Sequence, residues 1–352
     1  MDGTIILTGA SGGLGKELVK KLLRRPESYT LIFPGRYQKT AHAADLQRIV
    51  NSHGKRNNVA SMPEVNLARF DDIRTFISGI NRKVSVGAIP PIRALVLNAA
   101  LCYDLSGIRL TDQTGDRQHP PFEMNFAVNF LANVLLSLRL LESMDKQHGR
   151  IVYTSSCTHD PHRPGNEYYQ PGKLKWDVAK LAHPDMHNLD KDVAMESMRR
   201  YGASKLALVT FMHALRKRLD KTPDLSNISI AGVDPGAVLH ANIVQRASWT
   251  NRNFTFPLMQ LYTRWLAQYL WPNGLFRTAE KSAQDLLSAA LEPKHSWAHP
   301  TEAYFNGSEQ AEAAVEAKDE KKQQELWGLS LHYVGLDDES QMVLAPADTV
   351  GA

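Results

Sequence analysis

The chain of 352 residues has only two cysteines, Cys102 and Cys157, and no Cys-x-x-Cys spacing. Two cysteines cannot build the disulfide framework of a small secreted domain, and without the paired spacing they do not predict a zinc or redox site. We therefore expect a protein of a reducing compartment and place it in the cytoplasm.

The chain also lacks long apolar runs and basic blocks. No segment reaches about 18 uninterrupted apolar residues, so no membrane span is expected. The first apolar run meets Gly9 too early for a signal peptide or an N-terminal anchor. The formal net charge of +4 comes from 41 basic and 37 acidic residues spread along the chain. This spread argues against nucleic-acid binding and suits an anionic cofactor at least as well.

Short apolar runs alternate with longer helical patterns, which predicts strand-helix units and a parallel sheet. Strands are expected at residues 4–8, 30–34, 59–67, 93–98, 150–155, 228–233 and 303–306, and helices at 14–25, 41–51, 71–81, 122–144, 196–219 and 279–291. The fold class is therefore α/β, a doubly wound Rossmann sheet flanked by helices. We expect one catalytic domain over residues 1–308 and a C-terminal extension over 309–352, in which the tail at residues 309–336 packs as a closing helix.

Two stretches interrupt this alternation, an insertion at residues 157–196 and a segment at 237–276. Both follow the carboxyl ends of strands, where open parallel sheets bind ligands, so we interpret them as covering the substrate, with 237–276 as a lid. Residues 254–271 within the lid are rich in aromatic residues and leucine. They predict either a cover for an apolar substrate or a peripheral contact with an intracellular membrane. A homodimer is a further open alternative.

Residues 8–15 read TGASGGLG between the first strand and the first helix. Glycines in this turn let it fold tightly and let its backbone approach a pyrophosphate at the helix N-terminus. The spacing differs from the common Gly-x-Gly-x-x-Gly fingerprint, and a glycine-rich turn without a ligand is the alternative. The predicted cofactor contacts here are Gly9, Ser11, Gly13, Leu14 and Gly15.

The second strand ends in Phe33-Pro34-Gly35-Arg36, without an acidic residue. A carboxylate at this place accepts hydrogen bonds from the ribose 2′-hydroxyl of NAD, whereas a guanidinium pairs with the 2′-phosphate of NADP. The sequence therefore predicts NADP(H), with Arg36 holding the phosphate. The alternative is a solvated surface arginine.

Residues 201–205 read Tyr-Gly-Ala-Ser-Lys inside a predicted helix. The i, i+4 spacing puts Tyr201 and Lys205 on one face, where the ammonium stabilises a phenolate. Tyr201 can then serve as the acid in ketone reduction or as the base in alcohol oxidation. Taken alone, the pair is equally a tyrosine and a lysine that share a helix surface.

Two further polar positions strengthen the catalytic interpretation. The strand at residues 150–155 runs into Ser155 and Ser156 at the carboxyl edge of the sheet, where a hydroxyl can hydrogen-bond a substrate carbonyl oxygen. We choose Ser156. Asn129 lies among apolar residues, and a buried amide needs partners, with a structural contact between helices as the alternative.

Four histidines lie in or near the insertion: His159, His162, His183 and His187. Their spacings match no compact ligand set, so no metal is expected. We interpret them as part of a polar loop.

In this order, TGASGGLG, LNAA at 97–100, Asn129, Ser155-Ser156, YGASK and Asp-Pro-Gly at 234–236 resemble the short-chain dehydrogenase/reductase family over residues 4 to about 240. The resemblance implies a seven-stranded parallel sheet and a catalytic tetrad of Asn129, Ser156, Tyr201 and Lys205, in which the lysine also holds the nicotinamide ribose. It further implies cofactor contacts by Asn66, Leu67, Asn98, Ala99, Ala100, Tyr201, Lys205, Pro235, Gly236 and Val238.

The 44 residues between Ser156 and Tyr201 and the tail ELWGLSLHYVGL resemble the retinol dehydrogenase and protochlorophyllide reductase branch of this family. Members of that branch act on bulky, lipophilic, often membrane-borne substrates. The chain departs from the usual pattern at three positions: Asn66 replaces aspartate, Ala100 replaces glycine, and His240 replaces a threonine that contacts the nicotinamide carboxamide.

We therefore predict an NADP(H)-dependent oxidoreductase that moves hydride between nicotinamide and a ketone or alcohol of a lipophilic small molecule such as a steroid, retinoid, terpenoid or polyketide. One alternative is an NADPH-dependent reductase of a carbon-carbon double bond. Another is a non-catalytic protein that senses NADP.

Overall fold

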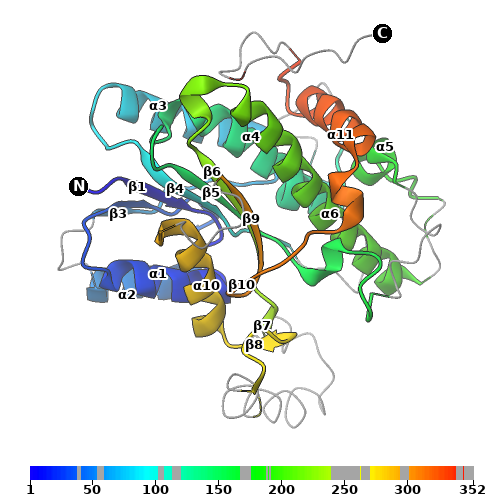
Figure 1. The fold of residues 1–352 in the computed structure, drawn as a ribbon, viewed down its shortest axis with the longest axis horizontal. Coiled ribbons are helices and arrows are strands. Elements are labelled where there is room, and N and C mark those ends of the chain that lie inside the picture. The colour runs from blue at the N-terminus through cyan, green and yellow to red at the C-terminus, as the bar shows by residue number, and fades with distance from the viewer. Residues whose placement is uncertain are drawn as a thin grey trace.

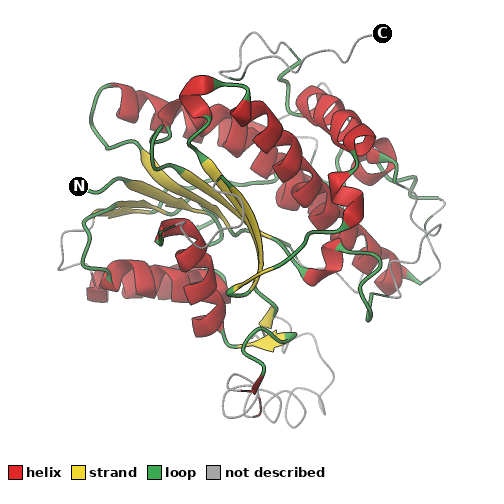
Figure 2. Ribbon diagram, viewed as in Figure 1, coloured by secondary structure: helices red, strands yellow, loops and turns green. Residues whose placement is uncertain are grey.

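The structure is a computed structural model that describes residues 1–37, 41–53, 59–101, 107–112, 120–166, 176–187, 189, 192–238, 262, 270–293, 301–337 and 344. The described residues form a central sheet with helices on both faces (Figures 1 and 2). Most of the predicted lid, including His240, lies outside them.

Within the described residues, eight strands form the central sheet in the order β10-β9-β6-β5-β4-β1-β2-β3. They are β1 (Thr4–Leu7), β2 (Thr30–Ile32), β3 (Val59–Ser61), β4 (Ile92–Leu97), β5 (Arg150–Thr154), β6 (Ser229–Asp234), β9 (Glu302–Asn306) and β10 (Glu309–Gln310). Seven run parallel, and β10 alone is antiparallel to its neighbour. The predicted doubly wound parallel sheet is confirmed, with one short strand added.

The strand order reverses between β1 and β4, since β2 and β3 lie on one side of β1 and β5, β6 and β9 lie beyond β4. At such a reversal the connections leave in opposite directions and open a crevice at the carboxyl ends of the strands. A second, two-stranded sheet pairs β7 (Ala237–Val238) with β8 (Phe276–Arg277) at the same end of the fold (Figure 1).

Helices cover both faces of the sheet (Figure 1). One face carries α1 (Gly13–Arg24), α2 (Ala41–His53) and α10 (Ala279–Leu291), and the other carries α3 (Phe70–Ser85), α4 (Ala132–Leu140) and α6 (Val193–Asp220). The short α5 (Val178–Ala182) and α11 (Glu320–Tyr333) pack on the outside of the second layer. Helix α11 is the closing helix that the tail predicts.

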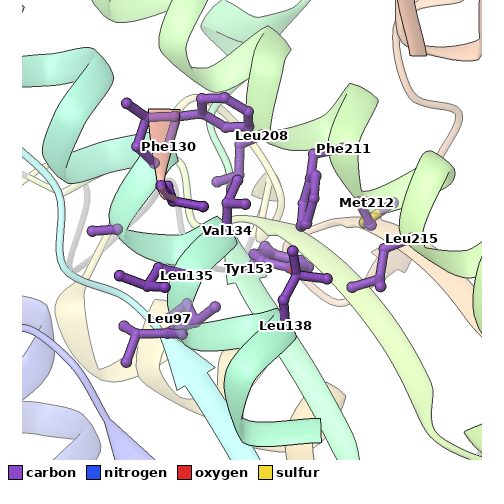
Figure 3. Packing of buried hydrophobic residues seen from close by; sticks show 14 of the residues in the cluster. Leu97, Phe130, Val134, Leu135, Leu138, Tyr153, Leu208, Phe211, Met212 and Leu215 are labelled. Atoms are coloured by element: carbon purple, nitrogen blue, oxygen red, sulfur yellow. The ribbon is translucent and has the colours of Figure 1, made fainter. Parts of the chain in front are cut away.

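The larger part of the core lies between β4, β5 and the second helix layer. Figure 3 shows Phe130, which precedes α4, Leu135 of α4 and Phe211 of α6 gathered around Tyr153 of β5. All four side chains are at most 1% exposed. This packing holds α6 against β5 and so fixes the position of the residues that α6 carries.

Two predicted elements are wrong in detail. Residues 122–144 do not form one α-helix, because a π-helix, η1 (Phe126–Leu131), precedes α4 and a 3-10 turn, η2 (Leu141–Ser143), follows it. Apolar periodicity reports which face is buried and does not separate these hydrogen-bond patterns. The strand predicted over 59–67 ends at Ser61, and Pro63, which has no N–H to donate, lies just beyond.

One described helical stretch, Phe126–Ser143, is long and apolar enough to cross a membrane by length and composition. Because 89% of it is buried inside the fold, it also has the character of a core helix.

Candidate active site

Lys205 reaches from α6 to the carboxyl end of β5. Its side chain is buried, and its Nζ donates a hydrogen bond of 2.8 Å to the carbonyl oxygen of Thr154. The same Nζ lies 5.8 Å from the ring centre of Tyr201, which is half-buried one turn earlier on the helix. The structure thus brings the predicted ammonium and phenol together beside the strand that leads to Ser156.

Ser156 follows β5 and is half-buried. Its Oγ accepts hydrogen bonds from the backbone N–H of Thr158 (3.3 Å) and from Thr158 Oγ1 (3.0 Å). With its lone pairs engaged, the hydroxyl retains its own proton to donate. Ser155 instead is buried and accepts from Tyr304 Oη at 3.1 Å, so of the two serines Ser156 is the one with an accessible hydroxyl.

Asn129 lies in η1 and is fully buried. Its Oδ1 accepts from the backbone N–H of Leu101 (2.7 Å), while its Nδ2 donates to Leu101 O (3.0 Å) and to Ser204 Oγ (3.1 Å). Ser204 Oγ in turn donates to Tyr201 O at 2.7 Å. Asn129 therefore ties the loop after β4 to the turn of α6 that carries Tyr201.

The glycine loop lies against the end of β4. Asn98 Nδ2 donates to Thr8 O (3.1 Å), and the backbone N–H of Ala99 donates to Thr8 Oγ1 (3.0 Å). Gly9 has φ +69°, and a Cβ there would lie 2.8 Å from Ala99 Cα. This close approach explains the glycine at position 9 and puts it beside Asn98, Ala99 and the exposed Ala100.

The start of α1 fits a bound pyrophosphate. A Cβ on Gly15 would lie 2.1 Å from Gly9 O, so only glycine lets the helix start approach the loop this closely. Gly12, the residue before the helix, offers no side chain to cap its first turn. The first N–H groups are therefore available to an anion, with Ser11, Gly13 and Leu14 half-buried around them.

Arg36 is exposed beyond the carboxyl end of β2, as expected for a group that meets a ligand phosphate or solvent. The structure also brings a carboxylate to this place, because Gly35 pairs with Glu64 and the Glu64 side chain accepts from the backbone N–H of Tyr37 at 2.8 Å. The sequence does not predict this neighbour, since Glu64 follows a different strand.

The other predicted adenine contacts lie in the turn before α3. Asn66 Oδ1 accepts from the backbone N–H of Ala68 at 3.1 Å, and Leu67 is buried in the core. The Asn66 oxygen is thus already used to shape the turn.

The Asp-Pro-Gly segment forms a tight loop after β6. Asp234 is buried, and its Oδ1 accepts from the N–H of Gly236 (2.9 Å), which has φ +70°. Arg163 from the insertion lies 3.5 Å from Asp234 Oδ2, and Arg277 Nη1 donates to Asp234 O at 2.7 Å. The loop that carries Pro235, Gly236 and the half-buried Val238 is thus held by two arginines that the sequence reading missed.

The histidines do not all belong to a polar loop. His159 is 4% exposed, and burial lowers its pKa from the ordinary value. Among the described residues no group of three or more His, Cys, Asp or Glu side chains is placed to hold a metal ion. Burial also raises the pKa of Cys157, so its thiol is not activated beside Ser156.

A family model described as short chain dehydrogenase matches residues 3–179. The short-chain dehydrogenase iccH of Talaromyces variabilis is 35% identical over 375 residues, covering 96% of this chain and 96% of that protein. Retinol dehydrogenase 13 of Homo sapiens is 26% identical, and the alignment covers 96% of this chain and 86% of that protein. Protochlorophyllide reductase A of Triticum aestivum is 24% identical, and the alignment covers 95% of this chain and 81% of that protein.

The fold is also similar to that of a solved structure. The L-sorbose reductase from Gluconobacter frateurii, complexed with NADPH and L-sorbose, aligns with a TM-score of 0.54 and 15% identity over 87% of this chain and 95% of that chain. At this identity the likeness concerns the fold alone.

Proposed function

Since this chain belongs to the short-chain dehydrogenase family, with relatives in its retinol dehydrogenase and protochlorophyllide reductase branch, we propose that it is an NADP(H)-dependent oxidoreductase acting on a ketone or alcohol of a bulky lipophilic molecule. The observation that carries the proposal is the hydrogen bond from Lys205 to Thr154 O, two residues before Ser156. It supports a site in which an ammonium, a phenol and a hydroxyl act on one substrate oxygen.

In this proposal a nicotinamide dinucleotide, held by the glycine loop and the start of α1, would supply or accept the hydride. Ser156 donates a hydrogen bond to the substrate oxygen, because its own lone pairs are engaged by Thr158. Tyr201 delivers the proton to that oxygen during reduction and removes it during oxidation. Lys205 stabilises the phenolate of Tyr201, and Asn129 positions the turn of α6 through Ser204.

The preference for NADP(H) is supported by the exposed guanidinium of Arg36 beyond β2. The nearby Glu64 carboxylate already accepts a backbone hydrogen bond from Tyr37, so it is partly satisfied without a ribose hydroxyl. The backbone of the glycine loop and the start of α1 would hold the pyrophosphate.

The lipophilic substrate class is supported by large apolar side chains at the described end of the lid. Leu270, Trp271 and Leu275 are all exposed. One relative is named a retinol dehydrogenase, after a lipophilic alcohol. The backbone N–H of Ala237, which follows the Pro235-Gly236 loop, donates to the Leu275 oxygen at 2.6 Å. Exposed apolar side chains beside this loop would favour an apolar ligand over a sugar or an amino acid.

The test is turnover of a panel of apolar ketones and aldehydes with NADPH, followed by product analysis. We expect an alcohol product, and a saturated carbon-carbon bond would instead indicate a double-bond reductase. Tyr201→Phe should lower kcat by about 1,000-fold while NADPH binding persists. Tyr29→Phe, a buried tyrosine before β2, is the control. Unchanged turnover in Tyr201→Phe would refute the mechanism.

A further inference from the structure

His159 ends the 3-10 turn η3 (Cys157–His159) that follows Ser156 directly. Both its backbone N–H and its ring contact the Ser156 carbonyl oxygen, at 3.0 Å from N and 2.7 Å from Nδ1. The backbone of Ser156 is extended, with φ −163° and ψ 151°. These angles orient the Cα–Cβ bond of Ser156 relative to the neighbouring peptide groups. A fixed carbonyl oxygen therefore helps to fix the point from which the Ser156 hydroxyl extends, while the contacts with Thr158 hold Oγ itself.

The other side of the imidazole contacts the C-terminal segment. The backbone N–H of Ala314, just before η8 (Val315–Lys318), donates to His159 Nε2 at 3.1 Å. An N–H donor opposite Nε2 requires that this nitrogen accept, so the ring proton resides on Nδ1 and is donated to Ser156 O. The buried ring is therefore held in one tautomer by two backbone partners.

A third contact comes from β9. Tyr304 Oη lies 3.2 Å from His159 Nδ1 and donates to Ser155 Oγ at 3.1 Å, and the two rings pack with centroids 4.9 Å apart. Tyr304 fits here because β6 carries Gly232, where a Cβ would lie 2.7 Å from the Tyr304 ring. One buried polar network thus connects Tyr304 and His159 to the two serines that follow β5.

Another contact also joins the segment after Ser156 to the segment around η8. His162, three residues after His159, pairs with the carboxylate of Glu316 in η8. This pair is partly exposed, and exposed ion pairs contribute little to stability, about 0–1 kcal/mol. The contact that reaches Ser156 is the buried one through His159.

We propose that His159 is a positioning residue for the Ser156 hydroxyl, and that its hydrogen bond from Ala314 makes the segment 313–317 part of the active-site scaffold. The inference rests on the proposed function, in which Ser156 binds the substrate oxygen. It assigns a role in the reaction to a residue that lies away from the substrate and to a part of the chain beyond the nucleotide-binding sheet.

The test is a double-mutant cycle on an apolar ketone that the wild-type protein reduces, with kcat and KM measured for Ser156→Ala, His159→Phe and the double variant. His159→Phe alone should lower kcat about tenfold, less than the loss of a whole oxyanion donor, and leave the KM for NADPH unchanged. In the Ser156→Ala background, His159→Phe should lower kcat no further, because the effects of two substitutions that act through one group are not additive. Equal losses in both backgrounds overturn the proposal.

His159→Asn is the conservative variant, because its amide can still donate to Ser156 O from near the Nδ1 position. It should recover most of the kcat lost in His159→Phe, and no recovery counts against the proposal. His213→Phe is the matched control. His213 is largely buried on α6 and also contacts β9, through Glu302 at 2.7 Å, so its replacement should leave kcat unchanged.

Amide hydrogen exchange tests the C-terminal contact without turnover. A peptide covering 313–317 should exchange faster in His159→Phe than in the wild type, and equal protection overturns that part of the proposal. If the wild-type protein binds NADPH and reduces no carbonyl compound, the proposed function fails. The positioning role is then decided by a crystal structure of His159→Phe, which supports it if Ser156 Oγ has moved and contradicts it if Oγ has not.

Discussion

The ammonium group of Lys205 donates to the carbonyl oxygen of Thr154 over 2.8 Å, although 51 residues separate them in the chain. The bond links the middle of α6 to the carboxyl end of β5. A buried ammonium needs such a partner, and here the partner is the backbone that leads to Ser156. Lys205 therefore fixes the lateral position of α6, and with it the phenol of Tyr201.

Lys205→Met keeps the length and burial of the side chain and removes its charge and its donor. We expect kcat to fall about 100-fold or more, since the phenol loses the cation that stabilises its ionised form. Steady-state kinetics with NADPH and a reducible ketone measure the loss. Lys217→Met is the control, because Lys217 is half exposed on the same helix and pairs with Glu320 of α11; a similar loss there would contradict the assignment.

Gly15→Ala would put a Cβ 2.1 Å from Gly9 O, so the loop and α1 must separate. We expect NADPH affinity to fall about tenfold or more, which corresponds to about 1.4 kcal/mol of lost binding free energy. Fluorescence titration with NADPH measures it. Gly79→Ala on α3 meets no atom within 4 Å and should instead stabilise the fold by about 0.5–1 kcal/mol. Equal NADPH affinity in the two variants would contradict the pyrophosphate site.

Arg36→Ala tests which dinucleotide the site prefers. If the guanidinium holds the 2′-phosphate, losing a charged hydrogen bond worth about 1.5–3 kcal/mol should raise the KM for NADPH roughly 10- to 100-fold. The KM for NADH should stay the same. Arg24→Ala, at an exposed position at the end of α1, should change neither value. If the two KM values rise together, Arg36 does not discriminate between the cofactors.

The buried His159 predicts a pH dependence of stability. Burial lowers its pKa in the folded protein, while the unfolded chain takes up a proton near pH 6.5. The stabilising contribution is therefore complete above about pH 6.5 and is lost as the pH falls toward the folded pKa. Urea unfolding near pH 7.5 and near pH 5.5 should show a smaller stability difference for His159→Asn than for the wild type. Replacing the exposed His187 by Asn should leave that difference unchanged, and an identical difference in all three proteins would mean that His159 does not carry it.

Much of the fold follows from the sequence because its signals are local. Seven strands occur close to where apolar runs predict them, and the glycine turn is defined by eight consecutive residues. The i, i+4 spacing of Tyr201 and Lys205 likewise needs only a helix to bring the side chains together. The sequence does not predict strand β10, because two residues are too few to show an alternating pattern. It does not predict the π-helix at Asn129 either, because the apolar pattern of a helix does not specify which backbone hydrogen bonds it forms.

The sequence by itself determined the order of strands and helices, the turn at the start of α1 and the helix face that Tyr201 shares with Lys205. Only the tertiary structure decided which backbone atom Lys205 meets and which serine is accessible. It also decided that His159 is buried against Ala314, 155 residues away. Periodicity specifies a buried face, but a single hydrogen bond between distant segments depends on how the whole core packs.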